Sequence, residues 1–426
     1  MNLEQIAAMV GTPAYAYDLA AVRAAHADLR AALPGQAVLY YSLKANPHPR
    51  LVTELAGLGC RAEVCSAGEI ETAICAGVHP DAILLTGPGK TAEVIEHAFG
   101  AGVHRFSVDS PGDLARVGAV ADGYGVAAEC LLRVNADEPV PGMGLAMTGT
   151  ASQFGADASW VIREPERFRE SGGARVTGLH LYMGTNLEEE ETLLRQFEIA
   201  ATTAASLTRL LGTPAEVDLG GGFGTPYARE GVRPRFRTLA GRLAAVLDEH
   251  LAGWREGRPA VAFESGRYLV GDSGVLICRV VDIKVSKGKT FAVVDAGVNH
   301  LGGMAGLRRL PPIRPTVRPF PGPARPAGNV PTTVVGPLCT PLDAFVRDAD
   351  LPRLSVGQLV SIPNVGAYGL TASLLAFLGH PAPVEVVVDS ELGAGEFVSV
   401  SRLALTREED TAFAYHLSPL SLEGSR

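Results

Sequence analysis

Lys44 is the first residue of this chain whose type and position suggest covalent chemistry. It ends the apolar segment VLYYSLKAN (38–46). A lysine at the mouth of an apolar interior is expected to have a lowered pKa, because burial disfavours the charged ammonium form. Its neutral amine could then form an imine with a carbonyl compound. A lysine that only extends its charge to solvent from a strand end is an equally simple interpretation.

A run of three glycines suggests a binding site for a phosphate group. Gly220, Gly221 and Gly222 lie in the segment AEVDLGGGFG (215–224). Without side chains, a backbone can approach a phosphate closely and point its N–H groups at the oxygens. Glycine-rich turns are common, so this pattern alone indicates little; its place after a predicted strand makes it more specific.

Two further pairs of polar residues follow apolar segments. Glu264 and Arg267 lie in AVAFESGRYLV (260–270), and a buried glutamate needs a cationic or protonated partner. An ion pair between these two neighbours is the simpler alternative. His180 and Tyr182 are two residues apart and would share one face of a strand. Either ring could stack on a flat ligand, or both could fill the interior.

Together, a lysine, a phosphate loop and a buried glutamate match one cofactor, pyridoxal phosphate. The aldehyde would bind the lysine, the phosphate the glycines, and the pyridine nitrogen the carboxylate. A carboxylate there keeps the ring nitrogen protonated, so the ring can accept the electrons left when a bond to Cα breaks.

The elements that must position these residues form a regular series. Eight apolar segments occur in the first two thirds of the chain, with stretches of helical spacing between them. They are residues 38–46, 62–66, 82–87, 105–110, 130–137, 176–184, 215–224 and 260–270. Eight such units over about 240 residues predict a closed (β/α)8 barrel, and an open doubly wound sheet is the alternative. In such barrels the site lies at the carboxyl ends of the strands, with phosphate near strands seven and eight.

The pattern changes after residue 270. Residues 274–298 predict antiparallel strands joined by a Lys-Gly turn, and later strands are expected around 330–336, 357–364 and 383–389. Residues 311–331 contain eight prolines and are predicted to be a loop. We therefore expect a barrel domain over 23–270 and a β-rich domain over 271–426 that includes 1–22.

Composition excludes several classes of protein. The 426 residues are 47% apolar and 19% charged, which is typical of a globular protein of two domains. The net charge of −9 disfavours binding to nucleic acid or to an anionic membrane surface. No segment approaches twenty apolar residues, and residues 1–18 do not resemble a signal peptide. The cysteines show no CxxC or disulfide-framework spacing, so we expect a reducing, cytoplasmic location.

These segments resemble the fold-type III pyridoxal-phosphate decarboxylases, the group of diaminopimelate, ornithine and arginine decarboxylases. The similar stretches are GTPAYAYD (11–18), YYSLKAN (40–46), CSAGE (65–69), HLYMGT (180–185), VDLGGGF (217–223) and FESGRYLV (263–270). The resemblance implies an alanine-racemase-like fold with the cofactor linked to Lys44. It also implies that Thr185, Gly266 and Arg267 contact the phosphate, and that Glu264 meets the pyridine nitrogen.

The resemblance extends into the second domain. GPLCTPLD (336–343) looks like the family's catalytic cysteine motif, which implies that Cys339 reaches the partner subunit's cofactor and guides reprotonation of Cα. Asp343 and Thr340 would then lie near the substrate. NVGAYG (364–369) resembles the closing motif that places Tyr368 beside the cofactor. These motifs imply a head-to-tail homodimer with shared active sites.

Three departures from the family pattern bear on the substrate. Tyr182, not a histidine, stands at the ring-stacking position, and His180 lies two residues earlier. Thr340 follows the cysteine where amine-recognising members carry an acid. Residues 294–309, VDAGVNHLGGMAGLRR, lack the Arg-Pro-x-Leu-Tyr pattern that holds the distal carboxylate of diaminopimelate.

The leading hypothesis is therefore an α-decarboxylase of secondary metabolism. Its substrate would be an amino acid or an amino-acid conjugate, either as a small molecule or on an aminoacyl carrier protein. A basic cluster could meet the carrier: Arg308, Arg309, Arg314 and Arg318. A decarboxylase of diaminopimelate or a basic amino acid is one alternative. An amino-acid racemase is another, disfavoured by Glu264 and Cys339, and a non-catalytic relative is disfavoured by the presence of Lys44 and Cys339.

Overall fold

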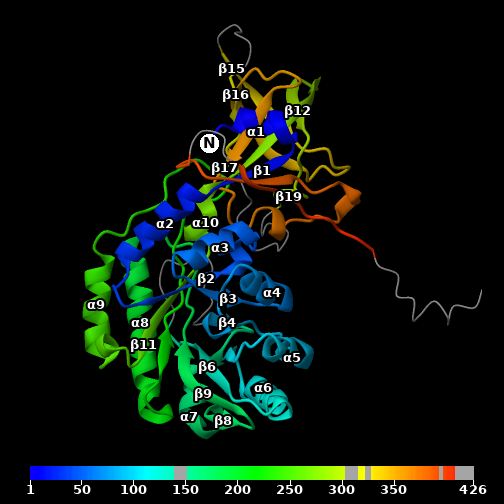
Figure 1. The fold of residues 1–426 in the computed structure, drawn as a ribbon. Coiled ribbons are helices and arrows are strands. Elements are labelled where there is room, and N and C mark those ends of the chain that lie inside the picture. Colours follow the sequence, from blue (N-terminus) through cyan, green and yellow to red (C-terminus); the bar gives the residue numbers. More distant parts are fainter. Residues whose placement is uncertain (139–150, 303–314, 322–327, 393–396, 408–426) are drawn as a thin grey trace, which may run out of the picture.

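The chain forms a barrel and a second, mostly β part that is joined to it (Figure 1). The structure is a computed structural model that describes residues 1–138, 151–302, 315–321, 328–392 and 397–407. No helix within these ranges is long and apolar enough to cross a membrane.

The barrel is closed by eight parallel strands, as predicted. In spatial order they are β2 (Val38–Ser42), β3 (Arg61–Val64), β4 (Ile83–Leu85), β5 (Arg105–Val108), β6 (Ala128–Asn135), β9 (Ala174–His180), β10 (Glu216–Asp218) and β11 (Ala260–Ser265). Parallel pairing of β6 with β9 and of β11 with β2 completes the circle. Each strand overlaps one of the eight predicted segments, although β3, β6 and β9 begin one or two residues before theirs. Each segment extends past the carboxyl end of its strand into the loops that form the site.

Helices between the strands cover the outside of the barrel (Figure 1). They are α2 (Leu19–Ala32), α3 (Pro49–Gly57), α4 (Ala67–Cys75), α5 (Ala92–Gly100), α6 (Pro111–Tyr124), α7 (Ala158–Arg163), α8 (Glu190–Leu211), α9 (Leu239–His250) and α10 (Arg267–Val270). Local sequence explains their starts: Ser66 caps α4 by accepting the N–H of Glu69, and Glu69 accepts the N–H of Cys65. The stretch CSAGE therefore ends a strand and begins a helix within five residues.

The second sheet contains strands from both ends of the chain. After α1 (Leu3–Val10), β1 (Ala14–Asp18) pairs with β12 (Gly274–Ser286) and β18 (Val384–Val388). The remaining strands are β13 (Lys289–Val294), β14 (Arg318–Pro319), β15 (Asn329–Val335), β16 (Ala344–Pro352), β17 (Leu359–Pro363) and β19 (Phe397–Arg402). β12 and β13 form the predicted hairpin, and Lys287 and Gly288 at its turn both have positive φ, as a tight hairpin turn requires. The domain boundaries stay a prediction.

The prediction of a loop over the whole of 311–331 is wrong in part. Residues 303–314 and 322–327 lie outside the described residues, but β14 and the first residues of β15 fall inside the predicted loop. Pro331 is tolerated in β15 because pairing with β13 begins only at Thr332, so the strand is an edge on that side at Pro331.

Strand register decides which side chains enter the barrel. Tyr40, Leu84, Leu131 and Ala262 pack together in the interior. Because side chains alternate along a strand, the residues two positions further on also point inward, at the carboxyl end. Glu264 follows Ala262 in this way, and Arg133 follows Leu131. The amino end is closed by charges instead: Glu216 binds Arg61 and Arg105. These described residues thus close the amino end of the barrel interior.

Candidate active site

A cavity of about 670 Å³ opens at the carboxyl ends of the barrel strands. Its lining joins the predicted lysine, glutamate, arginine and tyrosines in one place. The described residues that line it are Lys44, Glu63, Cys65, Thr86, Gly87, Pro88, Gly89, Arg133, Gln153, Phe154, His180, Tyr182, Thr185, Glu264, Arg267, Tyr368 and Ala372. Residues that are far apart in sequence thus converge where the fold predicts a site.

Lys44 lies in a short 3-10 turn (Leu43–Ala45) directly after β2 and forms an ion pair that the sequence reasoning missed. Its Nζ is 3.0 Å from both carboxylate oxygens of Glu63, which is 2% exposed. The expectation of a lowered lysine pKa is wrong for this state. Burial acts to lower the pKa of Lys44, but the Glu63 carboxylate outweighs it and holds the pKa well above 10.5. The signal in the sequence that could have marked Glu63 as a site residue is an acid inside a predicted apolar strand.

The Lys44–Glu63 pair makes the stability of the cofactor-free protein depend on pH. Although burial opposes it, Lys44 and the Thr86 hydroxyl lower the pKa of Glu63 from 4.5 to about 2. A lowered pKa stabilises the fold above pH 4.5, and this contribution is lost as the pH falls towards 2. The difference corresponds to on the order of 3 kcal/mol, reduced by water that reaches Lys44, which is 41% exposed.

We therefore expect Glu63→Gln to lower the free energy of unfolding of the cofactor-free protein at pH 7, with roughly half that loss or less at pH 3. Denaturant unfolding of the wild type and the variant at pH 7, 4.5 and 3 measures the difference between their free energies of unfolding. The titration of other carboxylates affects both proteins equally and cancels in this difference. A wild-type-minus-variant difference that stays constant across this range would contradict the assignment.

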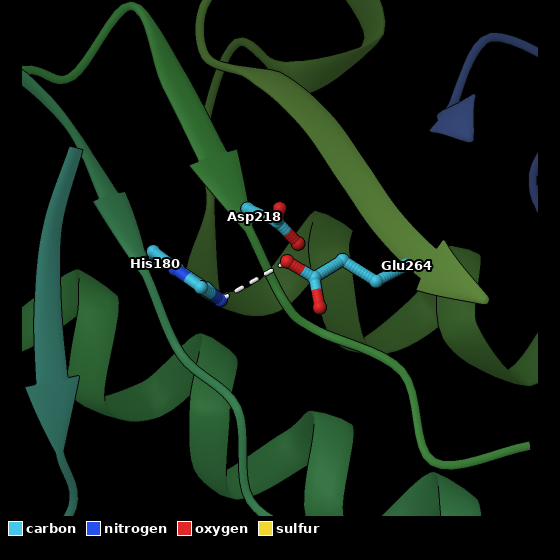
Figure 2. A group of neighbouring side chains, drawn as sticks. All are labelled: His180, Asp218 and Glu264. Atoms are coloured by element: carbon cyan, nitrogen blue, oxygen red, sulfur yellow. Dashed lines mark ion pairs between the residues drawn. The ribbon is translucent and has the colours of Figure 1, made fainter. Parts of the chain in front are cut away.

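His180, Asp218 and Glu264 form a buried group at the base of the cavity (Figure 2). His180 Nε2 lies 3.2 Å from Glu264 Oε1, and His180 Nδ1 lies 2.7 Å from Ser107 Oγ. Both side chains of the ion pair are 2% exposed. Glu264 therefore takes His180 as its ion-pair partner, and among the described residues it forms no ion pair with Arg267. His180 is thus held between Ser107 and Glu264 while it lines the cavity, and its predicted contact with the cofactor stays a prediction.

The three glycines pack so closely against the neighbouring strands that no side chain fits. A Cβ on Gly220, Gly221 or Gly222 would lie 2.6, 2.2 or 2.6 Å from a backbone carbonyl oxygen. Gly220 and Gly222 also have positive φ. Gln196 of α8 donates to the carbonyl of Gly221 and fixes the loop from outside. The glycines thus shape the loop through tight packing against neighbouring backbone.

Substituting the central glycine is expected to destroy this loop. Gly221→Ala places a methyl group against the carbonyl of Glu264, so the loop or β11 must move. We expect a loss of about 3 kcal/mol or more in stability and at least tenfold weaker cofactor binding. Gly241→Ala in α9 is the control, because its Cβ meets nothing within 4 Å and helical alanine is favoured by up to about 1 kcal/mol. Thermal unfolding measures the stability of each variant, and cofactor titration measures its affinity. Equal stability and affinity in the two variants would show that the loop can move to accommodate a methyl group.

A small extension of about 20 Å³ adjoins the main cavity beside the glycine loop. Gly222, Ser265 and Gly266 line it together with Arg267 and Thr185. Ser265 Oγ and Arg267 Nε are buried and have no hydrogen-bond partner among the described residues. Unpartnered donors beside glycines are what a phosphate group would satisfy. Ser265 lies within the stretch FESGRYLV, but the sequence analysis gave it no role.

The second sheet domain places Tyr368 at this end of the cavity. Its N–H donates to the carbonyl of Ala45, in the same turn as Lys44, at 2.7 Å, and Asn46 Nδ2 donates to the carbonyl of Gly366 at 2.8 Å. Tyr368 has φ of 52°, a conformation uncommon for a non-glycine residue. The Arg267 guanidinium lies 4.7 Å from the Tyr368 ring centre, so the loop over 364–369 covers the predicted phosphate end.

Tyr182 faces the cavity, as the predicted stacking residue should. Its ring centre is 5.9 Å from Lys44 Nζ and 5.8 Å from the guanidinium carbon of Arg133. Arg133 also lies 4.7 Å from the ring of Phe154. Sequence reasoning missed Arg133 and Phe154, which lack a motif; Arg133 is recognisable only as a cation that ends an apolar strand.

Cys339, Thr340 and Asp343 are not among the described residues that line this cavity. Cys339 is exposed. Asp343 is 3% exposed, and its two oxygens accept the N–H groups of Val298 at 2.8 Å and Leu338 at 2.7 Å. In this chain Asp343 therefore joins two loops of the second sheet domain. The proposed substrate roles of Asp343 and Thr340 stay predictions.

The residues present fit pyridoxal phosphate. The cavity offers an amine on Lys44, a buried carboxylate on Glu264 and a flat ring on Tyr182. The buried Glu264 Oε1 has no hydrogen-bond partner among the described residues, and neither do the donors at the glycine end. Each functional group of the cofactor therefore has a matching group in the protein.

Comparison with known proteins decides the family. A family model described as "Pyridoxal-dependent decarboxylase, pyridoxal binding domain" matches residues 19–271, more than half of the chain. The chain belongs to this family. It is a pyridoxal-phosphate-dependent amino-acid decarboxylase. When bound, the cofactor supplies the conjugated ring that withdraws electrons from Cα, and the protein supplies its binding and orientation.

Individual relatives of the decarboxylase cover almost its whole length. An L-glutamyl-[BtrI acyl-carrier protein] decarboxylase of Niallia circulans is 31% identical over 91% of this chain and 92% of its own. A diaminopimelate decarboxylase of Pseudomonas aeruginosa is 33% identical over 91% and 90%. The solved diaminopimelate decarboxylase of Helicobacter pylori, complexed with L-lysine, superposes with a TM-score of 0.80 at 27% identity, covering 94% and 95%.

Proposed function

We propose that this decarboxylase acts on an amino acid that is tethered to a carrier protein or built into a larger conjugate. The observation that carries the proposal is the sequence of residues 294–309, which lacks the Arg-Pro-x-Leu-Tyr pattern expected for binding free diaminopimelate. A relative of similar length acts on a glutamyl group on an acyl-carrier protein, as its name states. A tethered side chain ends in a neutral acyl linkage and needs no distal clamp.

The outer wall of the cavity supports this proposal. Gly87, Pro88, Gly89, Phe154 and Ala372 are uncharged. The acids among the described lining residues are Glu63, held by Lys44, and Glu264, held by His180. Neither is available to a distal ammonium group, which disfavours free lysine, ornithine or arginine as substrates.

We also propose that two copies of the chain share their active sites. Cys339, the predicted acid that returns a proton to Cα, does not line its own chain's cavity among the described residues. Its loop and the segment over 370–379 expose apolar side chains: Leu342 at 78%, Leu374 at 54%, Phe377 at 43% and Leu378 at 54%. Exposed apolar groups beside a cavity are typical of an interface between subunits.

A substrate panel tests the proposed substrate class. Carbon dioxide release would be measured from free L-glutamate, L-lysine, L-ornithine, L-arginine and diaminopimelate, and from the same amino acids as carrier-protein thioesters. We expect release from a tethered amino acid at least 100-fold above any free one. Release from a free basic amino acid or diaminopimelate at a comparable rate would instead assign the enzyme to primary metabolism. Chirality analysis of the recovered substrate would reveal a racemase.

Mixing two inactive variants tests the shared site. Lys44→Ala and Cys339→Ala would each be inactive as pure proteins, but a mixed dimer has one site that retains both native residues. We expect up to about one quarter of wild-type activity after subunit exchange. No recovery, with a dimer present by light scattering, would contradict a site built from two chains. Of the predicted basic cluster, Arg318 pairs with Glu230, and Arg308, Arg309 and Arg314 lie outside the described residues.

A further inference from the structure

Asp218 is the one member of the buried group in Figure 2 to which the sequence analysis gave no role. It ends β10, where it lies in register with His180 on one side and Ala262 on the other. Glu264 stands two residues after Ala262 and so points to the same interior face. One ligand atom from each of His180, Asp218 and Glu264 lies within 4.8 Å of the others.

The two oxygens of Asp218 have different surroundings. Oδ1 accepts the N–H of Gly220, the first glycine of the phosphate loop, at 2.8 Å. Oδ2 is buried and has no hydrogen-bond partner among the described residues. Figure 2 shows the carboxyl group directed at the carboxylate of Glu264. One residue thus contacts the phosphate loop and faces the acid at the opposite end of the cofactor site.

The charges in this group cannot all be present together. Asp218 is 0% exposed and Glu264 is 2% exposed. Neither forms an ion pair with a lysine or arginine among the described residues. Two ionised carboxylates at this separation, without water or a cation, are strongly unfavourable, so one of them binds a proton.

The neighbours decide which carboxylate is neutral. His180 Nε2 lies 3.2 Å from Glu264 Oε1, whereas the neighbour that donates to Asp218 among the described residues is a single backbone N–H. The other charged groups that face Asp218 are Glu216, paired with Arg61 and Arg105, and Glu63, paired with Lys44. Burial, with Glu264 beside it, raises the pKa of Asp218 well above 3.8.

We propose that Asp218 is a positioning residue held as the neutral carboxylic acid, whose proton faces Glu264 and keeps that glutamate ionised for the ring nitrogen of the cofactor. The inference rests on the proposed role of Glu264. It adds a residue to the site and states the form in which it acts. By bonding Gly220 as well, Asp218 links the positions of the two ends of the cofactor.

Two substitutions separate a neutral acid from a charged one. Asp218→Asn keeps an oxygen for the N–H of Gly220 and an uncharged donor towards Glu264, whereas Asp218→Ala keeps neither. We expect the asparagine variant to bind the cofactor within about threefold of wild type, and the alanine variant to bind it at least 30-fold more weakly. The asparagine variant should also keep the pH dependence of the bound cofactor's absorbance. Equal losses in both variants would show that a negative charge is required, and wild-type affinity in both would remove the positioning role.

If the alanine variant does not fold, infrared spectroscopy can test the protonation of Asp218 directly. The difference spectrum between wild-type holoenzyme and Asp218→Asn should contain the C=O stretch of one protonated carboxyl group. A carboxylate band in its place would overturn the proposal, because Asp218 would then be ionised. Glu264→Gln, measured in parallel, distinguishes failure of the proposed role of Glu264 from failure of the proton assignment on Asp218. An unchanged cofactor spectrum in that variant would refute the role of Glu264, whereas a changed one with an ionised Asp218 would refute only the proton assignment.

Discussion

Lys44→Ala is expected to lower carbon dioxide release by more than about 1,000-fold, because it removes the amine that links the cofactor and exchanges it with the substrate. The lysine lies in a turn held on one side by β2 and on the other by the N–H of Tyr368. No other lysine lines the cavity among the described residues, so none can replace it. The fold should persist, since the substitution removes an ion pair at the mouth of the barrel and leaves the core intact.

The measurement combines activity with the visible absorbance of the bound cofactor. We expect the band of the protein-linked cofactor to disappear in Lys44→Ala, while added cofactor still binds through the glycine loop. Lys289→Ala is a matched control, because Lys289 forms an exposed ion pair with Asp348 in the second sheet. An unchanged spectrum in Lys44→Ala would show that the cofactor is attached elsewhere and would remove the basis of the mechanism.

Glu264→Gln is expected to lower kcat roughly 100-fold, with a smaller change in KM. The amide has nearly the shape of the carboxylate but carries no charge, so it cannot hold a proton on the ring nitrogen. In this variant His180 Nε2 also loses its ionic partner. Because the substitution acts on the electron-withdrawing strength of the cofactor, the loss should fall on the chemical step.

A buried glutamate outside the site provides the control for this loss. Glu385 of β18 is 4% exposed and accepts the hydroxyl of Tyr17, and burial raises its pKa to about 7. Glu385→Gln should therefore leave kcat within about twofold. Single-turnover rates and the pH dependence of the cofactor absorbance distinguish the two variants. A Glu264→Gln enzyme with wild-type kcat would exclude a role of this carboxylate at the ring nitrogen.

The sequence by itself determined the parts of this decarboxylase that depend on short-range pattern. The spacing of apolar residues predicts the eight strands and their helices, and eight consecutive units favour a closed barrel over an open sheet. Lys44, the glycine run, Glu264 and Arg267 stand where strands end, and the order of the motifs identifies the cofactor. The Lys-Gly hairpin was also predictable, because positive φ at a two-residue turn favours particular residues.

Other features depend on register, which a single strand does not reveal. Glu63, Arg133 and Asp218 enter the barrel because neighbouring strands place them on the inner face beside Lys44, Tyr182 and Glu264. Pro331 joins a strand because its neighbour begins one residue later.

The same reason explains the wrong expectation for Lys44. Burial alone lowers the pKa of a lysine, but the sign of the shift depends on which acid lies opposite. Only the tertiary structure places Glu63 at 3.0 Å from Nζ. The sequence thus determined which chemistry the site contains, and the packing of strands decided the charge state in which its residues meet, because electrostatic energies depend on distance and burial.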